Sequence, residues 1–181
     1  MKNRSAGKCF LIGVLVFCLI LLAGCTTSEN PNEGPASVPG EDPVLEGPYP
    51  VVRVVDGDTI VVRVRRENEK IRLIGIDTPE AVHPDPSRNI PYGQVASDYT
   101  KKMLEGREVY LEFDVSHRDK YGRLLAYVYL DGRMFNEMLL EEGHARAGTY
   151  PPNVKYEDRF YQLQKKARKD KRGGWASDAF D

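Results

Sequence analysis

The segment from Arg72 to Glu80 reads Arg-Leu-Ile-Gly-Ile-Asp-Thr-Pro-Glu and combines a cation with two acids. It opens as an apolar strand headed by Arg72 and ends in a turn that carries Asp77 and Glu80. A guanidinium presents a planar fork of donors that matches the oxygens of a phosphate. Carboxylate oxygens are the natural ligands of a hard divalent cation. The segment therefore suits chemistry on phosphodiesters.

The residues around this segment are typical of short β-strands. β-Branched residues run over 51–55, stop at the turn signal Asp-Gly-Asp of 56–58 and resume over 59–66, which predicts a hairpin. After a polar turn over 67–70, residues 71–76 are expected to form a third strand. The three strands form a meander with short connections.

The rest of the domain predicts two more strands and three helices. Residues 79–91 contain four prolines and are expected to form an irregular surface loop. Apolar periodicity predicts helices over 96–104, 134–142 and 156–167, and strands over 109–113 and 124–130. Three strands, a helix, two strands and two helices indicate an α+β, mainly β fold: a five-stranded barrel with the helices beside it.

The first 24 residues have the pattern of an export signal. Three bases, at positions 2, 4 and 8, precede an uncharged run over 9–25 that ends in Leu-Ala-Gly-Cys. These four residues resemble the lipobox of prokaryotic lipoproteins, whose cysteine is lipidated and begins the mature chain. We therefore expect residues 1–24 to be a signal peptide and Cys25 to be lipidated, with an uncleaved anchor or ordinary secretion as alternatives. The protein would be an exported lipoprotein facing the extracytoplasmic side.

Residues 25–48 are rich in Pro, Gly, Ser, Glu and Asn and are expected to be a disordered tether for a domain at 49–181. All three cysteines lie before residue 26, so the domain has neither disulfides nor thiolate ligands. The chain holds 26 basic and 27 acidic residues; without the three bases of the signal and the five acids of the tether, 23 and 22 remain. Such a domain has no broad basic field, and a polyanion would be held by local cations and metal.

Three blocks of the sequence resemble the thermonuclease family, also known as the staphylococcal or micrococcal nuclease family. They are Val-Val-Asp-Gly-Asp-Thr at 54–59, the segment over 72–80, and Asp-Lys-Tyr-Gly-Arg-Leu-Leu-Ala-Tyr at 119–127. The similarity extends from about residue 51 to Trp175 and includes Asn136-Glu137. It implies an OB-fold barrel and calcium-dependent cleavage of DNA and RNA, leaving a 3′-phosphate.

The resemblance also implies which residues hold the metal. It makes Asp58 and Asp77 ligands of one Ca²⁺ ion, together with the backbone carbonyl of Thr78. Taken alone, Asp58 would belong to a hairpin turn. Calcium accepts several oxygen ligands in loose geometry, so water and a substrate phosphate can complete its shell.

The catalytic roles follow from the same resemblance. Glu80, which alone would be a solvated loop carboxylate, becomes the group that activates or orients the attacking water. Arg72 and Arg123, each by default a partner in a surface ion pair, converge on the scissile phosphate and neutralise the charge that builds in the transition state.

Three further residues match substrate contacts of the family. Lys120 and Tyr121 would contact a neighbouring phosphate, and Tyr150 would pack its ring against a base or sugar. The family often has two tyrosines one residue apart, whereas this chain reads Gly-Thr-Tyr at 148–150.

Together these observations indicate a monomeric, membrane-tethered, calcium-dependent endonuclease acting on DNA and RNA. One alternative is a catalytically silent OB-fold that only binds nucleic acid or protein. Another is a surface lipoprotein with a structural or adhesive role. The chain keeps the full set of acids and arginines named above, which favours the enzyme.

Overall fold

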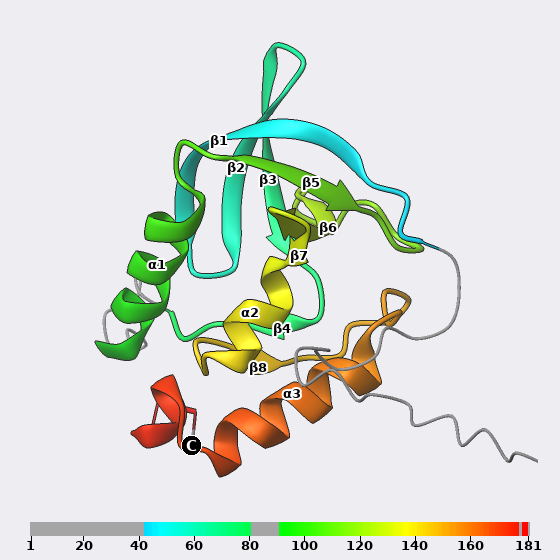
Figure 1. The fold of residues 1–181 in the computed structure, drawn as a ribbon. Helices are drawn as coiled ribbons and strands as arrows, with labels where there is room; N and C mark the ends of the chain where they lie inside the picture. Colours follow the sequence, from blue (N-terminus) through cyan, green and yellow to red (C-terminus); the bar gives the residue numbers. More distant parts are fainter. Residues whose placement is uncertain (1–41, 81–90, 178, 181) are drawn as a thin grey trace, which may run out of the picture. The chain divides into compact units, whose positions relative to one another are not determined.

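The computed structural model describes residues 42–80, 91–177 and 179–180 (Figure 1). The expected signal peptide, Cys25 and most of the expected tether lie outside the described residues, as does most of the loop predicted over 79–91. Within the described ranges, no helix has the length and apolar character needed to cross a membrane.

Five strands form a closed barrel, and three short strands lie beside it. The barrel strands are β1 (Glu46–Asp56), β2 (Thr59–Val64), β3 (Glu67–Leu73), β5 (Glu108–Glu112) and β6 (Leu124–Leu130). Strand β7 (Arg133–Met134) pairs with β6, while β4 (Ile76–Asp77) pairs with β8 (Arg146–Ala147).

The barrel closes because β1 pairs with two neighbouring strands and β3 pairs with β6. The second half of β1 pairs with β2 and its first half with β5, both antiparallel, with register shifts along β1 in each pairing. Such irregularities bend a strand and increase its twist, which a small barrel requires. Strands β2 and β3 are antiparallel, and the parallel pairing of β3 with β6 completes the ring. The predicted mainly β, five-stranded OB-fold barrel is thus confirmed.

Three helices pack around the barrel, as predicted. They are α1 (Pro91–Leu104), α2 (Phe135–Glu141) and α3 (Glu157–Lys169), followed by a 3-10 helix over Gly173–Ala176. Helix α1 packs on β1, whereas α2 lies between β6 and α3 (Figure 1). The apolar face of α3 buries Phe160, Leu163 and Ala167. Barrel residues such as Ile60, Val62, Ile71, Leu73, Leu111 and Val128 form the core and are at most 1% exposed.

Some predicted boundaries differ from those observed. Residues 67–70 are not a turn: they begin β3, and the chain reverses at Arg65 and Arg66 instead, with Arg65 at a φ of 56°. Strand β3 ends at Leu73 rather than residue 76. Pro91 opens α1, a position where the missing N–H costs nothing. Strand β1 begins at Glu46, ahead of the expected domain start at residue 49.

One buried side chain ties α2 to the segment that carries the acids. Asn136 is fully buried; its Oδ1 accepts from the Val128 N–H at 2.9 Å, and its Nδ2 donates to the Ile74 carbonyl at 2.9 Å. Because both bonds are made inside the core, they fix the course of the chain after β3.

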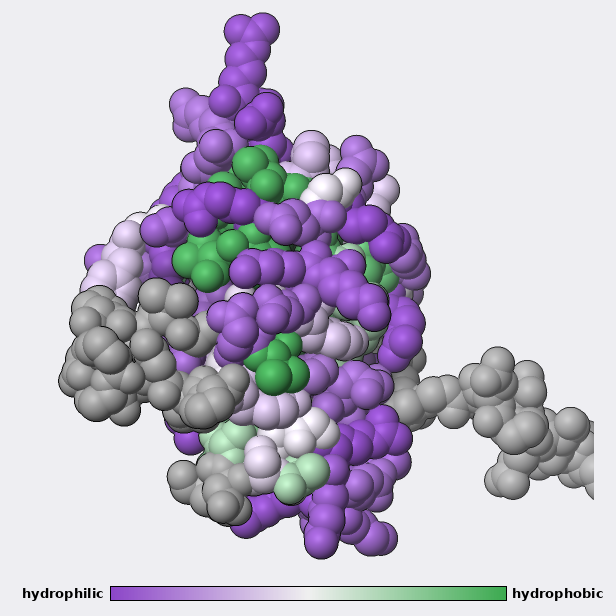
Figure 2. All heavy atoms as spheres, turned by 90° about the vertical axis from the view of Figure 1, so that its left-hand side faces the viewer, coloured by the Kyte–Doolittle hydropathy of each residue, from purple (hydrophilic) through white to green (hydrophobic). Residues whose placement is uncertain are grey.

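Charged and polar residues cover most of the face seen in Figure 2, which shows the side of α1. The apolar patches on this face are small and separate. The chemistry of this face is therefore set mainly by polar groups.

Candidate active site

Arg72 lies between two carboxylates. It stands opposite Thr59 in the β2–β3 ladder, which brings it next to Asp58. Its Nη1 is 2.5 Å from Asp58 Oδ2, and its Nη2 donates to Asp77 Oδ1 at 3.2 Å. The Nη1 contact is an ion pair without an aligned hydrogen bond, because the N–H groups of this buried atom do not point at an acceptor. One guanidinium thus holds both predicted metal-binding aspartates in a common site.

The turn after β3 brings Asp77 back towards the barrel. Gly75 occupies it with a φ of 74°, and a Cβ there would lie 2.7 Å from the Phe160 ring. Only glycine fits both the backbone conformation and the close approach of α3. The Gly75 carbonyl accepts from the Gly148 N–H at 3.0 Å, next to the β4–β8 pairing.

Thr78 fixes the carboxylate of Asp58. Both its backbone N–H and its Oγ1 donate to Asp58 Oδ2, at 3.0 and 3.1 Å, while Thr59 Oγ1 donates to Oδ1 at 3.0 Å. Asp58 is only 7% exposed, so it has little freedom to turn away. The structure therefore brings Asp58, Asp77 and Thr78 close together.

Two more carboxylates lie at this site. Asp56 and Glu80 lie close enough for the charge of one to affect the other. Burial raises the pKa of Asp56 to about 6, and the nearby charges of Asp58 and Glu80 act in the same direction. Asp56 was missed as a site residue because Asp-Gly-Asp fits an ordinary turn, yet it contributes to an acidic cluster.

Arg123 lies directly before the first residue of β6. Arg72 is paired with Leu125, so Arg123 lies two positions away on the neighbouring strand, towards the same face of the sheet. Its Nε donates to Asp119 at 2.6 Å, and Asp119 also accepts from the N–H groups of Tyr121 and Arg123. These bonds hold the Arg123 side chain through Nε, and among the described residues neither of its Nη atoms donates to an acceptor.

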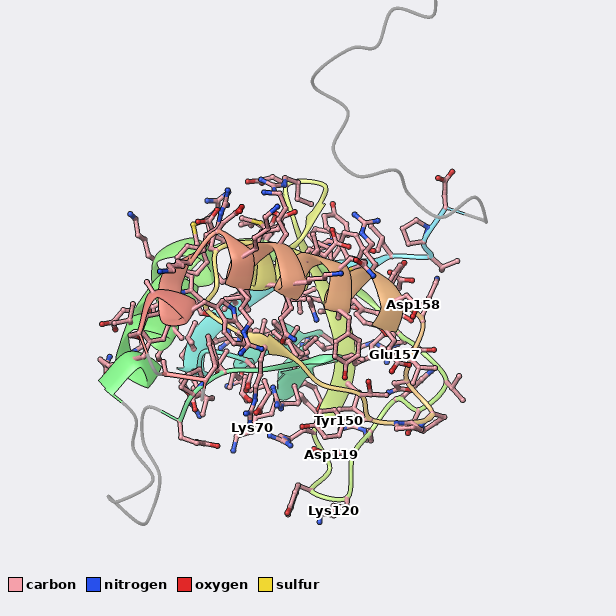
Figure 3. The ribbon with its side chains drawn as sticks, turned by 90° about the horizontal axis from the view of Figure 1, so that it is seen from below. Lys70, Asp119, Lys120, Tyr150, Glu157 and Asp158 are labelled. Atoms are coloured by element: carbon pink, nitrogen blue, oxygen red, sulfur yellow. The ribbon has the colours of Figure 1, made fainter. Side chains whose placement is uncertain are left out.

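The predicted substrate contacts are exposed. Lys120 Nζ lies 5.0 Å from the centroid of the Tyr121 ring, which is 73% exposed. Tyr150 is 58% exposed, and Figure 3 shows it on the same edge of the view as Asp119 and Lys120.

The loops that carry these residues are joined through one buried amide. The Asn153 side chain accepts from the N–H of Ser116 at 2.7 Å and donates to its carbonyl at 2.8 Å. Asn153 is 4% exposed, so this clamp is shielded from water. It fixes the segment of Tyr150 against the segment that leads to Lys120.

A third arginine, missed by the sequence reasoning, lies on β8. Arg146 is the cross-strand partner of Asp77, and its Nη2 and Nε donate to Asp77 Oδ2 at 2.9 and 3.2 Å. Arg72 contacts the other oxygen of the same carboxylate. No local pattern marked Arg146, because its partner is 69 residues away in the sequence.

The side chains of this site fit a hard divalent cation by their donor chemistry. Every candidate ligand is an oxygen, and the crowded carboxylates would be relieved by a positive ion. Among the described residues, however, no group of three or more His, Cys, Asp or Glu side chains is arranged to hold a metal by itself. A cation here would need two carboxylates, backbone oxygen, water and substrate.

Comparison with known proteins gives one consistent result. A family model described as "Staphylococcal nuclease homologue" matches residues 70–177. The "Thermonuclease" of Staphylococcus hyicus is 44% identical over 177 residues, covering 98% of this chain and 100% of the relative. The "Thermonuclease" of Staphylococcus intermedius is 44% identical over 163 residues, 90% and 95% of the two chains. "Endonuclease YncB" of Bacillus subtilis (strain 168) is 44% identical over 130 residues, 71% of this chain and 61% of the relative.

Proposed function

Because this chain belongs to the staphylococcal nuclease family and is a nuclease that hydrolyses phosphodiester bonds, we propose that it is a calcium-dependent endonuclease. Its substrates are DNA and RNA, and its products end in a 3′-phosphate. It acts outside the cell membrane, tethered through a lipid on Cys25.

The observation that carries this proposal is the contact of Arg72 with both Asp58 and Asp77. It places two ligands suited to calcium next to a guanidinium suited to phosphate. A catalytically silent binding module has no need for such a cluster, because buried charges are costly to assemble.

The side chains have distinct roles in this proposal. Asp58, Asp77 and the Thr78 carbonyl would hold a Ca²⁺ ion, which would supply positive charge to the phosphate oxygens when bound. Glu80 orients the attacking water and accepts its proton, a role that its exposed position at the rim of the acidic cluster permits.

The arginines stabilise charge rather than transfer protons. Arg72 and Arg123 donate to the oxygens of the phosphate as negative charge builds during attack. Neither guanidinium loses its proton near neutral pH, so the leaving oxygen takes its proton from water. Lys120 and Tyr121 bind a neighbouring phosphate, and the Tyr150 ring packs on a base or sugar.

The test is a cleavage assay with the purified protein. Plasmid DNA, single-stranded DNA and RNA are each incubated with the protein in two separate reactions, one with calcium and one with excess EDTA. We expect all three to be cut in calcium only, with ends that prime a DNA polymerase only after phosphatase treatment. Retardation without cutting would indicate a silent binding module, and neither effect would indicate a structural role.

The tether has its own test. The wild type and a Cys25→Ser variant are expressed and the cells are fractionated. We expect the wild type in the membrane fraction with a lipidated N-terminal cysteine by mass spectrometry, and Cys25→Ser outside it. A wild type released freely into the medium would instead support ordinary secretion.

A further inference from the structure

We propose that Arg146 binds a phosphate of the nucleic acid next to the one that is cut, as a third guanidinium of the substrate site. The inference rests on the proposed function, because it assigns a further contact to the same substrate. None of the family motifs in the sequence includes this residue.

The position of Arg146 is set by the fold. Strand β8 pairs with β4 so that Arg146 lies directly across from Asp77. Both of its hydrogen bonds go to one oxygen of Asp77 and are made by Nε and Nη2. Among the described residues its Nη1 donates to no acceptor, so one edge of the guanidinium is open to a ligand.

The ion pair with Asp77 does not account for this arginine by itself. Asp77 already contacts Arg72, and the Arg146 side chain is 54% exposed. An ion pair with that much solvent around it adds little to stability and is readily exchanged. A phosphate presents two charged oxygens to a guanidinium, as a carboxylate does, so Arg146 can exchange one anion for the other.

The surroundings of Arg146 also fit a nucleic-acid strand. Tyr150 follows four residues later, at most about 14 Å along an extended chain. Arg146 therefore lies within reach of a strand that meets both the Tyr150 ring and the acidic cluster around Asp77. The segment over 81–91 holds a single base, Arg88, so cations from other elements are needed to hold the backbone.

The salt dependence of binding separates a phosphate contact from a mere counterion of Asp77. A fluorescein-labelled single-stranded oligonucleotide is titrated by anisotropy in calcium, with Glu80→Gln as the background that limits cleavage. Arg146→Ala, Arg146→Lys and Arg107→Ala are compared between 0.05 and 0.5 M salt. Arg107 is the matched control because it is 48% exposed and pairs with one carboxylate, that of Asp131, at 2.6 Å.

The logarithm of affinity falls as the logarithm of salt concentration rises. We expect Arg146→Ala to make this slope shallower by about 0.7, the value of one phosphate contact on a single strand. Its loss of affinity should accordingly be about five-fold larger at 0.05 M than at 0.5 M salt. Arg146→Lys should keep most of the slope, because it keeps the charge. Arg107→Ala should match the background.

An unchanged slope in Arg146→Ala, with normal binding by the background protein, overturns this inference alone. A background protein that binds no oligonucleotide overturns the proposed function as well. In cleavage by the otherwise wild-type enzyme, Arg146→Ala should raise KM with a smaller effect on kcat, since the contact is made before and during the reaction.

Discussion

Gly57 allows the turn of Asp56 and Asp58 to pack directly against Thr78. A Cβ at residue 57 would lie 2.8 Å from Thr78 Oγ1, 2.9 Å from Cγ2 and 3.0 Å from Cβ. Rotation of the Thr78 side chain would not relieve the last of these contacts. Gly57→Ala should therefore push Thr78 away from Asp58, whose carboxylate Thr78 fixes with two hydrogen bonds.

The expected loss of unfolding free energy in Gly57→Ala follows from two opposing effects. Overpacking a tight site costs about 1–3 kcal/mol. Alanine also lowers the conformational entropy of the unfolded chain, which stabilises the folded protein by about 0.4–1 kcal/mol. The net loss of unfolding free energy should be about 1–2 kcal/mol, while kcat/KM should fall about tenfold or more because the site is displaced.

Urea unfolding and steady-state cleavage of single-stranded DNA measure the two effects. Gly132→Ala is the control: none of the described residues lies within 4 Å of a Cβ placed there, but the φ of 79° is strained for alanine. We expect it to lose a similar free energy and keep its activity. Equal activities of the two variants would contradict this account.

A double-variant cycle tests the contact itself. In a Thr78→Ala background, two of the three close atoms are absent, so Gly57→Ala should cost at least about 0.5 kcal/mol less than in the wild type. An unchanged cost would show that Thr78 is not what the added methyl group meets.

Three other variants test separate parts of the structure. Glu80→Gln should lower kcat by orders of magnitude with an unchanged far-UV circular dichroism spectrum, and normal cutting would remove Glu80 from the chemistry. Glu112 is 2% exposed and accepts hydrogen bonds from Tyr129, Tyr156 and Lys155. Glu112→Ala should therefore lower the free energy of unfolding in urea by about 3–5 kcal/mol. A loss below about 1 kcal/mol would contradict this. Burial lowers the pKa of His144, so the unfolded chain binds more protons, and stability should fall as pH drops below about 6.5. His144→Leu should flatten that decline in urea unfolding between pH 5 and 7, and an equal slope would exclude His144 as its source.

The barrel strands could be predicted because their β-branched residues follow a clear pattern. The β2–β3 turn could not be placed, because Arg65 adopts a left-handed conformation that sequence patterns reserve for Gly, Asn or Asp. Strand β8 has two residues and exists only because β4 lies beside it. Such an element has no local signal.

The residues of the site also divide into those with a local sequence signal and those without one. Motif resemblance named Asp58, Arg72 and Asp77, and the structure places them together. Asp56 and Arg146 were missed, since the signal of each is its contact with another segment rather than its neighbours in the sequence. Local patterns fix the strands, whereas barrel closure decides which charges meet.

The contacts within this site imply that cation and nucleic acid strengthen each other's binding. Arg72 and Arg146 pair with the carboxylates that would bind a cation under the proposed function, and the same ion pairs engage the guanidinium groups that would bind phosphates. A bound cation would displace the arginines from the carboxylates, and a bound phosphate would displace the carboxylates from the arginines. Each ligand would therefore free the groups that bind the other. By linkage, calcium should raise oligonucleotide affinity by the same factor by which the oligonucleotide raises calcium affinity. Calorimetric titrations of Glu80→Gln in both orders measure the two factors; independent affinities would mean that these ion pairs persist when the ligands bind.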